Sequence, residues 1–565
     1  MCVLPQILNR FENFVDQIYE KNVFDLNYLD GSQNIRNNQL TKNKSKNIIT
    51  IYSPKKKKYK KRQSDQKMIQ SIAKRLIQQR TLGKQFFSTS HINQEYIPNK
   101  PEPLKFTPRN NKGPGLKNNH RSSPWTESEV LKSNEDHVVY TWGATDPMRK
   151  SSISIARGEG IYLYDYKGNK YIDMTSQAIN NNLGYGIPEP VLNSITHQLK
   201  NLHHVYGGLT ITEPRAKLAQ ILNDITPADI TGFVFPLTGS DANEVAIRTA
   251  RKFTGRHKIL TRYKSYHGSS VGALNATGDF RRSFAEQGVS GFVKFFDLQA
   301  FQFKWGITQQ EAIKNYLAYL EEVIINENPS TVAAIMIESI TGSAGALVNP
   351  PEVIQGVRAL CDKYNILLIM DEVMVGLGRC GEMFAFQTYD GIVPDMFTCA
   401  KGLSGSYLPL SAVGFRKDIQ DFFRTNPLGW GTTYQGHPVS CIAGYEVVKY
   451  MLEQNICDHV KQLEKVMVKR MDELINKHNC LRQGRVRGLF GAFDIVGADG
   501  QLIQRNFSDP TPEPVLKFKK RLLENGIFQW VRAPVLHIAP PLIITEQELN
   551  HAFDMIDDAL KVMDH

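Results

Sequence analysis

The sequence predicts an α/β protein with a mainly parallel sheet, followed by a smaller α+β domain. Up to about residue 440, short apolar runs alternate with helical patterns. Such near-continuous apolar runs are typical of strands buried on both faces of a parallel sheet. After residue 440, a long helical pattern precedes strands and helices in α+β order. A length of 565 residues is also too great for one ordinary domain.

The N-terminal part of the chain differs in composition from the rest. Residues 1–67 are rich in Asn, Lys and Gln, which indicates low order. Residues 68–90 contain no acidic residue and place apolar and basic side chains on opposite helical faces, the pattern of a mitochondrial transit peptide. A basic surface helix is the alternative. Residues 91–137 are expected to be a linker rich in Pro, Asn, Gly and Ser. The predicted location is therefore the mitochondrial matrix.

Charge and cysteine content exclude several classes of protein. The net charge of +12 is concentrated in one basic run, Lys55 to Arg62, so a nucleic-acid role rests on that run alone and we expect no nucleic-acid partner. The seven cysteines are odd in number and show no CxxC spacing, which argues against a disulfide framework and a zinc site. We expect no metal. No apolar window approaches about 18 residues, so no membrane span is expected.

The remaining chain divides into three predicted segments: an N-terminal segment of the small-domain and interface region (138–200), a large domain (201–440) and a C-terminal small domain (441–565). Residues 160–174 alternate apolar and polar side chains around a Lys-Gly-Asn turn and predict a β-hairpin. Apolar runs in the large domain predict buried strands at 232–237, 257–263, 331–338, 364–372 and 395–400. In the small domain we expect a helix over 439–455 and a strand over 489–497.

One candidate site follows the first of these strands. The turn from Thr238 to Asp241 opens a helix, and its Gly239 and Ser240 offer backbone N–H groups and a hydroxyl to an anion. Ordinary helix capping, with Ser240 as the N-cap, is the alternative.

Charged and aromatic residues follow the later strands, where ligands of open α/β sheets bind. Tyr266 is placed to stack on a flat ring and His267 to brace it, although a packed loop aromatic is the simpler interpretation. Asp371 ends a strongly apolar strand and requires a cation or a protonated partner, with Val373 on the same face. Lys401 ends another strand, where a lysine that snorkels to the surface is the alternative.

Together these residues match the needs of one cofactor. Pyridoxal 5'-phosphate needs an anion cup, a ring stack, a carboxylate opposite the ring nitrogen and an amine for a Schiff base. The amine must lie in surroundings that favour its neutral form. Gly402, next to Lys401, leaves space beside the backbone.

From about Tyr140 to Asp564 the chain resembles the class III pyridoxal-phosphate aminotransferases of fold type I. The resemblance implies a large domain with a seven-stranded sheet and a smaller C-terminal domain. Motifs that carry it occur in order and with family-like spacing: TGSDANE (238–244), RTARKFTGRHKI (248–259), YHG (266–268), IESITGSAG (337–345), LCDKYNILLIMDEVMVGLGRCG (360–381), FAFQ (384–387), PDMFTCAKGL (394–403), PLSAVG (409–414), TTYQGHP (432–438) and APPLIITEQEL (539–549).

The resemblance implies roles for individual residues. Lys401 would bind the cofactor aldehyde and later move the proton, and Asp371 would pair with the ring nitrogen. Tyr266 and Val373 would contact opposite ring faces, with His267 bracing Tyr266. Gly239 and Ser240 would hold the phosphate.

Three further residues come from the same resemblance. Thr433 would reach the phosphate of the neighbouring subunit, which implies a homodimer with shared sites. Glu338 would lie near the substrate side, and Trp142 at the entrance.

The predicted reaction moves an amino group from a donor to a 2-oxo acid such as pyruvate or 2-oxoglutarate. Members that use α-amino acids commonly carry an arginine before the APPL segment, but this chain has His537 there and Arg532 earlier. This pattern looks most like the taurine and ω-amino acid branch, with Arg532 as the anion binder; a surface or interface arginine is the alternative. Tyr185 also replaces a histidine common in the family, and Cys380 makes a small change in GRCG.

Two other functions stay open at this level. The chain could be a non-catalytic structural subunit of a larger mitochondrial assembly, because fold alone does not prove function. It could also be a pyridoxal-phosphate-dependent lyase of the same family.

Overall fold

The computed structural model describes residues 124–284, 288–299, 305–504 and 509–564. The predicted low-order extension (1–67), the transit-like helix (68–90) and most of the expected linker therefore lie outside the described residues. At the end of that linker, residues 127–137 form helix α3 (Glu127–His137), which begins at a capping box between Thr126 and Glu129 and buries no residue. Regular structure thus begins before residue 138.

The central element is a seven-stranded, mainly parallel sheet, as predicted. Its strand order is β4-β10-β9-β8-β7-β5-β6, and β10 is antiparallel to both of its neighbours while the other adjacent pairs are parallel. The strands span Ile230–Val234 (β4), Lys258–Arg262 (β5), Phe292–Phe295 (β6), Val332–Glu338 (β7), Leu367–Asp371 (β8), Met396–Cys399 (β9) and Ala412–Arg416 (β10).

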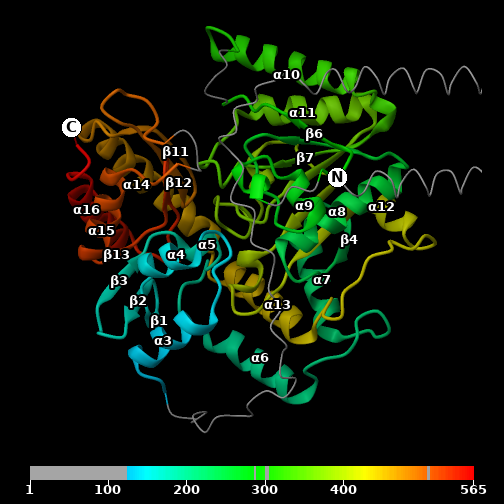
Figure 1. Ribbon diagram of the computed structural model, residues 1–565. Helices are drawn as coiled ribbons and strands as arrows, with labels where there is room; N and C mark the ends of the chain where they lie inside the picture. The colour runs from blue at the N-terminus through cyan, green and yellow to red at the C-terminus, as the bar shows by residue number, and fades with distance from the viewer. Residues whose placement is uncertain (1–123, 285–287, 300–304, 505–508, 565) are drawn as a thin grey trace, which may run out of the picture. The chain divides into compact units, whose positions relative to one another are not determined.

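The two faces of this sheet are covered by different helices. In β8, Leu367 and Ile369 belong to one buried cluster with helix α8 (Gly239–Thr254), whereas Leu368 and Met370 belong to another with helix α11 (Pro351–Tyr364). Figure 1 accordingly shows α10 (Gln309–Asn326) and α11 on one side of the sheet and α8 on the other. Because side chains alternate along a strand, the residue that ends β8 points toward α8.

Two four-stranded sheets lie outside the central one. One is a hairpin sheet, β1-β2-β3, joined in parallel by a strand from the far end of the chain, β13. Its β2–β3 pair confirms the predicted hairpin. The other sheet has the order β11-β12-β15-β14 and is antiparallel. The bounds are Ile155–Glu159 (β1), Tyr162–Asp165 (β2), Lys170–Asp173 (β3), Leu481–Arg487 (β11), Phe490–Ile495 (β12), Ile527–Phe528 (β13), Val531–Arg532 (β14) and Val535–Ile538 (β15).

Helix α13 begins with Pro438, whose missing N–H suits a first helical turn, and packs on α6 and α7. The other α-helices span Thr145–Ser151 (α4), Ser176–Ile179 (α5), Glu189–Asn201 (α6), Glu213–Ile225 (α7), Val271–Ala276 (α9), Gln309–Asn326 (α10), Lys417–Phe422 (α12), Pro438–Glu453 (α13), Ile456–Lys477 (α14), Glu513–Glu524 (α15) and Glu546–Leu560 (α16). Short 3-10 turns span Phe280–Phe284 (η1), Pro329–Thr331 (η2), Ala385–Thr388 (η3) and Lys401–Ser404 (η4). Within the described ranges, no helix combines the length and apolarity that a membrane crossing requires.

Candidate active site

Three neighbouring strands bring polar side chains to the same edge of the central sheet. Glu338 ends β7, Asp371 ends β8, and the two are register partners; Asp371 is in turn paired with Thr398 of β9. Lys401 follows β9 after one residue, Ala400, and begins η4 with a backbone φ of 45°. The predicted catalytic residues therefore meet at one place because the strands that carry them are parallel neighbours.

Asp371 is the centre of a buried hydrogen-bonded group that we name the carboxylate cluster (Asp371, His267, Asn243 and Thr398). Its side chain is 3% exposed. One oxygen accepts from His267 Nδ1 and from Asn243 Nδ2, each at 2.8 Å. Thr398 Oγ1 donates to Asn243 Oδ1 at 2.7 Å. The cluster holds a carboxylate in fixed orientation inside the protein, where each of its bonds is stronger than in water.

Lys401 lies beside this cluster. Burial lowers the pKa of its amine to about 8, and the nearby carboxylates of Asp371 and Glu338 oppose that shift. The lowered pKa gives the neutral amine a substantial population near pH 8, which an exposed lysine lacks. A neutral amine is the form that attacks a carbonyl or takes up a proton.

The N-terminus of α8 forms a tight, glycine-lined turn next to the cluster. A Cβ on Gly239 would come within 2.7 Å of Val373 Cγ1, and one on Gly268 within 2.3 Å of Ser240 Oγ. Ser240 Oγ accepts from the backbone N–H of Ser269 at 3.0 Å. The alternative of Ser240 as N-cap is wrong, because Thr238 caps the helix through a capping box with Asp241. Ser240 is thus left inside the first turn.

Tyr266 has aromatic and charged neighbours on its ring. Its backbone N–H donates to Glu338 Oε1 at 3.0 Å. The ring makes an edge contact with Trp142, centroid to centroid 6.2 Å, and the guanidinium carbon of Arg281 lies 3.4 Å from the ring centroid. The structure thus brings Trp142 and the cation of Arg281 to the ring of Tyr266, a meeting that the sequence did not predict.

Arg281, Asp279 and Arg532 form a second charged group, the arginine cluster. Arg281 Nε donates to Asp279 Oδ1 at 3.1 Å, and Arg532 lies 3.6 Å from the same carboxylate. Burial, and to a smaller extent the neighbouring Arg281, lower the pKa of Arg532 to about 10. Two guanidinium groups thus share one carboxylate beside Tyr266, which leaves net positive charge facing the site.

Two predicted positions have other surroundings. Thr433 is exposed on the loop before α13, and none of the contacts among the described residues joins it to Ser240 or Lys401. His537 is fully buried, stacks on Trp530, and places Nε2 3.1 Å from the backbone oxygen of Gly342. Burial lowers the pKa of His537 to about 4, so this imidazole is neutral at physiological pH.

The side chains fit pyridoxal phosphate. His267 Nε2 is buried without a hydrogen-bond partner, on the ring whose other nitrogen bonds Asp371. At Gly239 and Gly268 a side chain would fill the turn that a phosphate group requires. Lys401 would hold the cofactor aldehyde, Asp371 its ring nitrogen, Gly239 and Ser240 its phosphate, and Tyr266 and Val373 its ring faces.

Sequence reasoning missed Asn243, Asp279 and Arg281. Asn243 lies in the first turn of α8 and reads as a capping residue, although it is buried and donates both to Asp371 and to the backbone oxygen of His267. One signal was available: Asn243 is one helical turn after Gly239, on the side that must face the sheet. Nothing in the spacing of Asp279 and Arg281 distinguishes them from a polar loop.

Comparison with known proteins identifies the family of this chain. The model of the class-III aminotransferase family matches residues 145–560. An acetylornithine aminotransferase of Caldanaerobacter subterraneus subsp. tengcongensis is 32% identical over 425 residues, which cover 74% of this chain and 96% of that protein. A probable gamma-aminobutyrate transaminase 3, mitochondrial, of Oryza sativa subsp. indica is 30% identical over 461 residues, which cover 77% of this chain and 87% of that protein.

A solved structure gives the same result. The taurine:2-oxoglutarate aminotransferase from Bifidobacterium kashiwanohense, in complex with PLP and glutamate, superposes with a TM-score of 0.74 at 37% identity, and the match covers 78% of this chain and 98% of that one. These matches favour the enzymatic interpretation over that of a structural subunit. With its family match, its sheet and its lysine–aspartate pair in agreement, this chain belongs to the class-III aminotransferases and is a pyridoxal-phosphate-dependent transaminase.

Proposed function

We propose that the donor is an ω-amino acid or a taurine-like amine, and that the acceptor is a 2-oxo acid such as pyruvate or 2-oxoglutarate. The observation that carries this proposal is the contrast between His537 and Arg532. The position before the APPL segment holds the buried, neutral imidazole of His537. This imidazole lacks the positive charge and the paired N–H donors with which a guanidinium binds a carboxylate. The guanidinium of Arg532 lies instead next to Asp279, in the arginine cluster.

The arginine cluster suits the acidic end of such a substrate. Asp279 is shared by two guanidinium groups, so a substrate carboxylate or sulfonate is able to take over part of their hydrogen bonding. The relatives and the neighbouring structure named for 4-aminobutyrate and taurine support the same class of donor. In these compounds the reacting amine and the anionic group are at opposite ends of the molecule.

Pyridoxal phosphate, when bound, supplies an aldehyde and a ring that accepts electrons. The protein supplies the proton steps and the orientation. Lys401 Nζ takes a proton from the donor carbon and returns one later, because its lowered pKa lets it alternate between the two forms near neutral pH. The carboxylate cluster holds the side chain of Asp371 in one orientation beside Lys401.

A half-reaction screen tests the proposal. We expect taurine, β-alanine and 4-aminobutyrate to remove the visible absorbance of the bound cofactor, and alanine to do so more slowly. In Arg532→Met we expect the KM for the 2-oxo acid to rise roughly tenfold to a hundredfold, as for the loss of a charged hydrogen bond. If only α-amino acids react, or if Arg532→Met leaves every KM unchanged, the substrate proposal fails.

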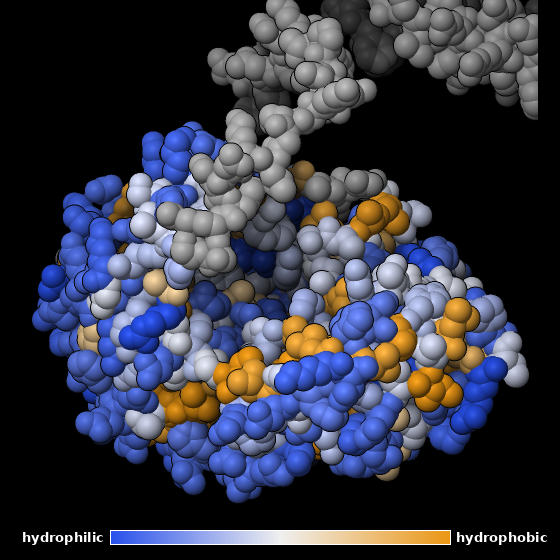
Figure 2. Space-filling view, turned by 90° about the horizontal axis from the view of Figure 1, so that it is seen from below, coloured by the Kyte–Doolittle hydropathy of each residue, from blue (hydrophilic) through white to orange (hydrophobic). Residues whose placement is uncertain are grey.

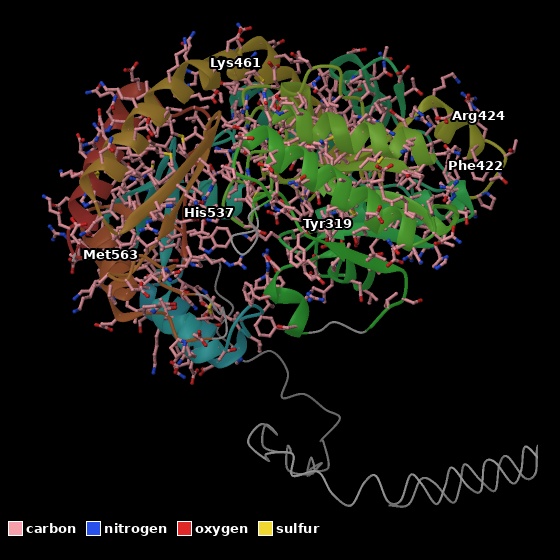
Figure 3. The ribbon with its side chains drawn as sticks, turned by 90° about the horizontal axis from the view of Figure 1, so that it is seen from above. Tyr319, Phe422, Arg424, Lys461, His537 and Met563 are labelled. Carbon is pink, nitrogen blue, oxygen red and sulfur yellow. The ribbon has the colours of Figure 1, made fainter. Side chains whose placement is uncertain are left out.

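Surface variants provide matched controls. Arg424 and Lys461 lie at the periphery of the molecule, well away from His537 (Figure 3), and their side chains are 66% and 46% exposed. Arg424→Met is expected to keep the KM of the unchanged protein. Lys401→Ala is expected to lose turnover with every donor, and Lys461→Ala to keep it.

We also propose a mitochondrial location and a homodimer. The acid-free segment 68–90 and the relative named as mitochondrial support the location. Peptide mapping of native protein is expected to place the mature N-terminus between Phe87 and His91; peptides from residues 10–60 in mature material would contradict it. Exposed apolar side chains on α6 and the loop after it support a face that a second subunit covers: Leu192, Leu199, Leu202, Tyr206, Leu209 and Ile211. Figure 2 shows apolar residues gathered on the face seen from below.

A further inference from the structure

The turn that carries Lys401 has an unusual backbone. Lys401 has a φ of 45°, and Ser406, just after the end of η4, has a φ of 65°. Residues other than glycine rarely adopt this left-handed region, and they persist there only where the surrounding structure holds them. Because the position of the Lys401 amine depends on this backbone, whatever holds the turn also positions the amine.

The segment 176–182 packs against both ends of this turn. A Cβ on Gly402 would come within 2.2 Å of Asn182 Nδ2, so the amide of Asn182 lies directly against the backbone that follows the lysine. At the other end, Asn180 Nδ2 donates to Ser406 Oγ at 2.8 Å, and this hydroxyl donates to the backbone oxygen of Asn180 at 2.6 Å. The turn is therefore held by a segment that lies far from it in the sequence.

Asn182 is itself fixed in one orientation. Its Oδ1 accepts from Arg379 Nη2 at 3.0 Å, and its Nδ2 donates to the backbone oxygen of Leu377 at 2.7 Å. Asn182 is 2% exposed and Arg379 is fully buried. The amide of Asn182 thus cannot turn without the loss of hydrogen bonds inside the protein, where unsatisfied polar groups are costly.

The guanidinium of Arg379 joins three segments of the chain without a hydrogen bond to a carboxylate. Besides its bond to the amide, it donates to Ser176 Oγ at 3.1 Å and to the backbone oxygens of Leu489 and Pro540. In the part of the chain that the structure describes, each acceptor of this group is a neutral oxygen, and Asp173 acts on it through charge alone. Buried charges are usually paired, so this positive charge is only partly balanced.

The charge of this guanidinium acts on Lys401. Burial, and to a smaller extent the positive charges of Arg281 and Arg379, lower the pKa of the Lys401 amine to about 8, against the opposing charges of Asp371 and Glu338. Arg281 belongs to the arginine cluster, whereas Arg379 has no part in the site described above. Two links, one through packing and one through charge, therefore join Arg379 to the amine.

We propose that Asn182 and Arg379 are positioning residues for Lys401: Asn182 holds the backbone of its turn, and Arg379 orients Asn182 and places a positive charge near the amine. The charge favours the neutral form of the amine, which is the reactive one. This inference goes beyond the proposed donor class, because Lys401 acts in the same way on every donor.

Kinetics of the holoenzyme test the role of Asn182. In Asn182→Ala the amide is lost, while the charge of Arg379 stays. We expect kcat to fall about tenfold to a hundredfold with 4-aminobutyrate and with alanine alike, because a small displacement of a reacting group costs this much. We expect KM to change by less than about twofold, since no substrate contact is removed. Asn326→Ala, at the exposed end of α10, is expected to keep both constants.

Competitive labelling tests the role of Arg379 without turnover. The cofactor is removed from the full chain, and a trace of acetic anhydride reacts with neutral amines over a range of pH. Mass spectrometry compares the peptide of Lys401 with that of Lys469, whose side chain is 76% exposed. The midpoint for Lys401 is expected near pH 8. It is expected to rise by about half a unit to one unit in Arg379→Met, and to stay in Asn182→Ala and Arg424→Met.

Each result has a defined meaning. An unchanged midpoint in folded Arg379→Met overturns the inference, because Arg379 would then only stabilise the fold. Full kcat in Asn182→Ala also overturns it, and this result is available even if Arg379→Met does not fold. Failure of 4-aminobutyrate while alanine reacts would contradict the proposed donor class and leave this test intact, since alanine reports on Lys401 as well.

Discussion

The carboxylate cluster and a cavity of about 660 Å³, whose wall includes Arg532 and the buried Asp297, are both charged, but they differ in how their hydrogen bonds are satisfied. In the cluster, Asp371 bonds to three donors, including the backbone N–H of Val373 at 2.9 Å. In the cavity, Asp297 has none. In the role that we propose for Asp371, the satisfied group is pre-organised for chemistry that is the same for every substrate. Asp297 is instead balanced only by nearby charge, because it acts on Lys264 without accepting a hydrogen bond.

Asp371→Asn gives the largest expected effect and tests the first half of this comparison. The amide removes the negative charge and directs donors at His267 or Asn243. We expect kcat/KM to fall by about 10² to 10⁴ with taurine, β-alanine and 4-aminobutyrate alike. A loss confined to one donor would place Asp371 in substrate selection and break the comparison. Asp390→Asn, at an exposed aspartate, serves as the control.

Glu338 gives an intermediate effect that depends on pH. Burial raises its pKa to about 7 from the usual 4.5. The folded state then keeps a proton that the unfolded state releases. The contribution of Glu338 to the free energy of unfolding is therefore present in full below pH 4.5 and is lost as pH rises through 7. The difference corresponds to about 3 kcal/mol. We expect Glu338→Gln to remove this contribution to the pH dependence of the free energy of unfolding, which denaturant unfolding between pH 4.5 and 7 measures. Burial also raises the pKa of Glu372 to about 7, so the contribution of Glu372 to the pH dependence is expected to remain. An unchanged pH dependence in Glu338→Gln would show that Glu338 is ionised throughout this range.

Thr433→Ala gives the smallest expected effect and extends the comparison to an exposed residue. If Thr433 serves the phosphate of a neighbouring subunit, the loss of one hydrogen bond is expected to weaken cofactor binding about fivefold. Absorbance measures the dissociation of the cofactor, and sedimentation of the same sample measures the oligomeric state. Thr425→Ala, on the exposed turn after α12, is the control. A fully active monomer would contradict the shared site.

Much of the fold, and the meeting of Asp371 with Lys401, was predictable from the sequence. A charged residue directly after a strongly apolar strand is rare, so Asp371 and Lys401 stand out, and parallel neighbours bring such residues together. The seven-stranded sheet followed from the alternation of apolar runs with helical patterns, together with the family resemblance.

The arginine cluster and the cavity were not predictable in this way. Asp279 and Asp297 lie in loops and Arg281 in the short turn η1, where charged residues are ordinary and their spacing carries no period. The surroundings of these residues depend on which segments meet in space and on which side chains become buried, and the local sequence encodes neither. Asp297 is the clearest case, because in sequence it is simply a polar residue after a short strand.

The pairing of β3 with β13 has a consequence for how the chain is made. Ile172 pairs with Ile527, and Asp173 with Phe528. During synthesis the hairpin of β2 and β3 leaves the ribosome long before its parallel partner β13 is made. The edge of β3 therefore stays unpaired while the whole central sheet is translated. Contacts between such distant segments slow folding, and unpaired strand edges favour association with other chains. Completion of this sheet is therefore expected to be a late step, at which a chaperone would be most useful.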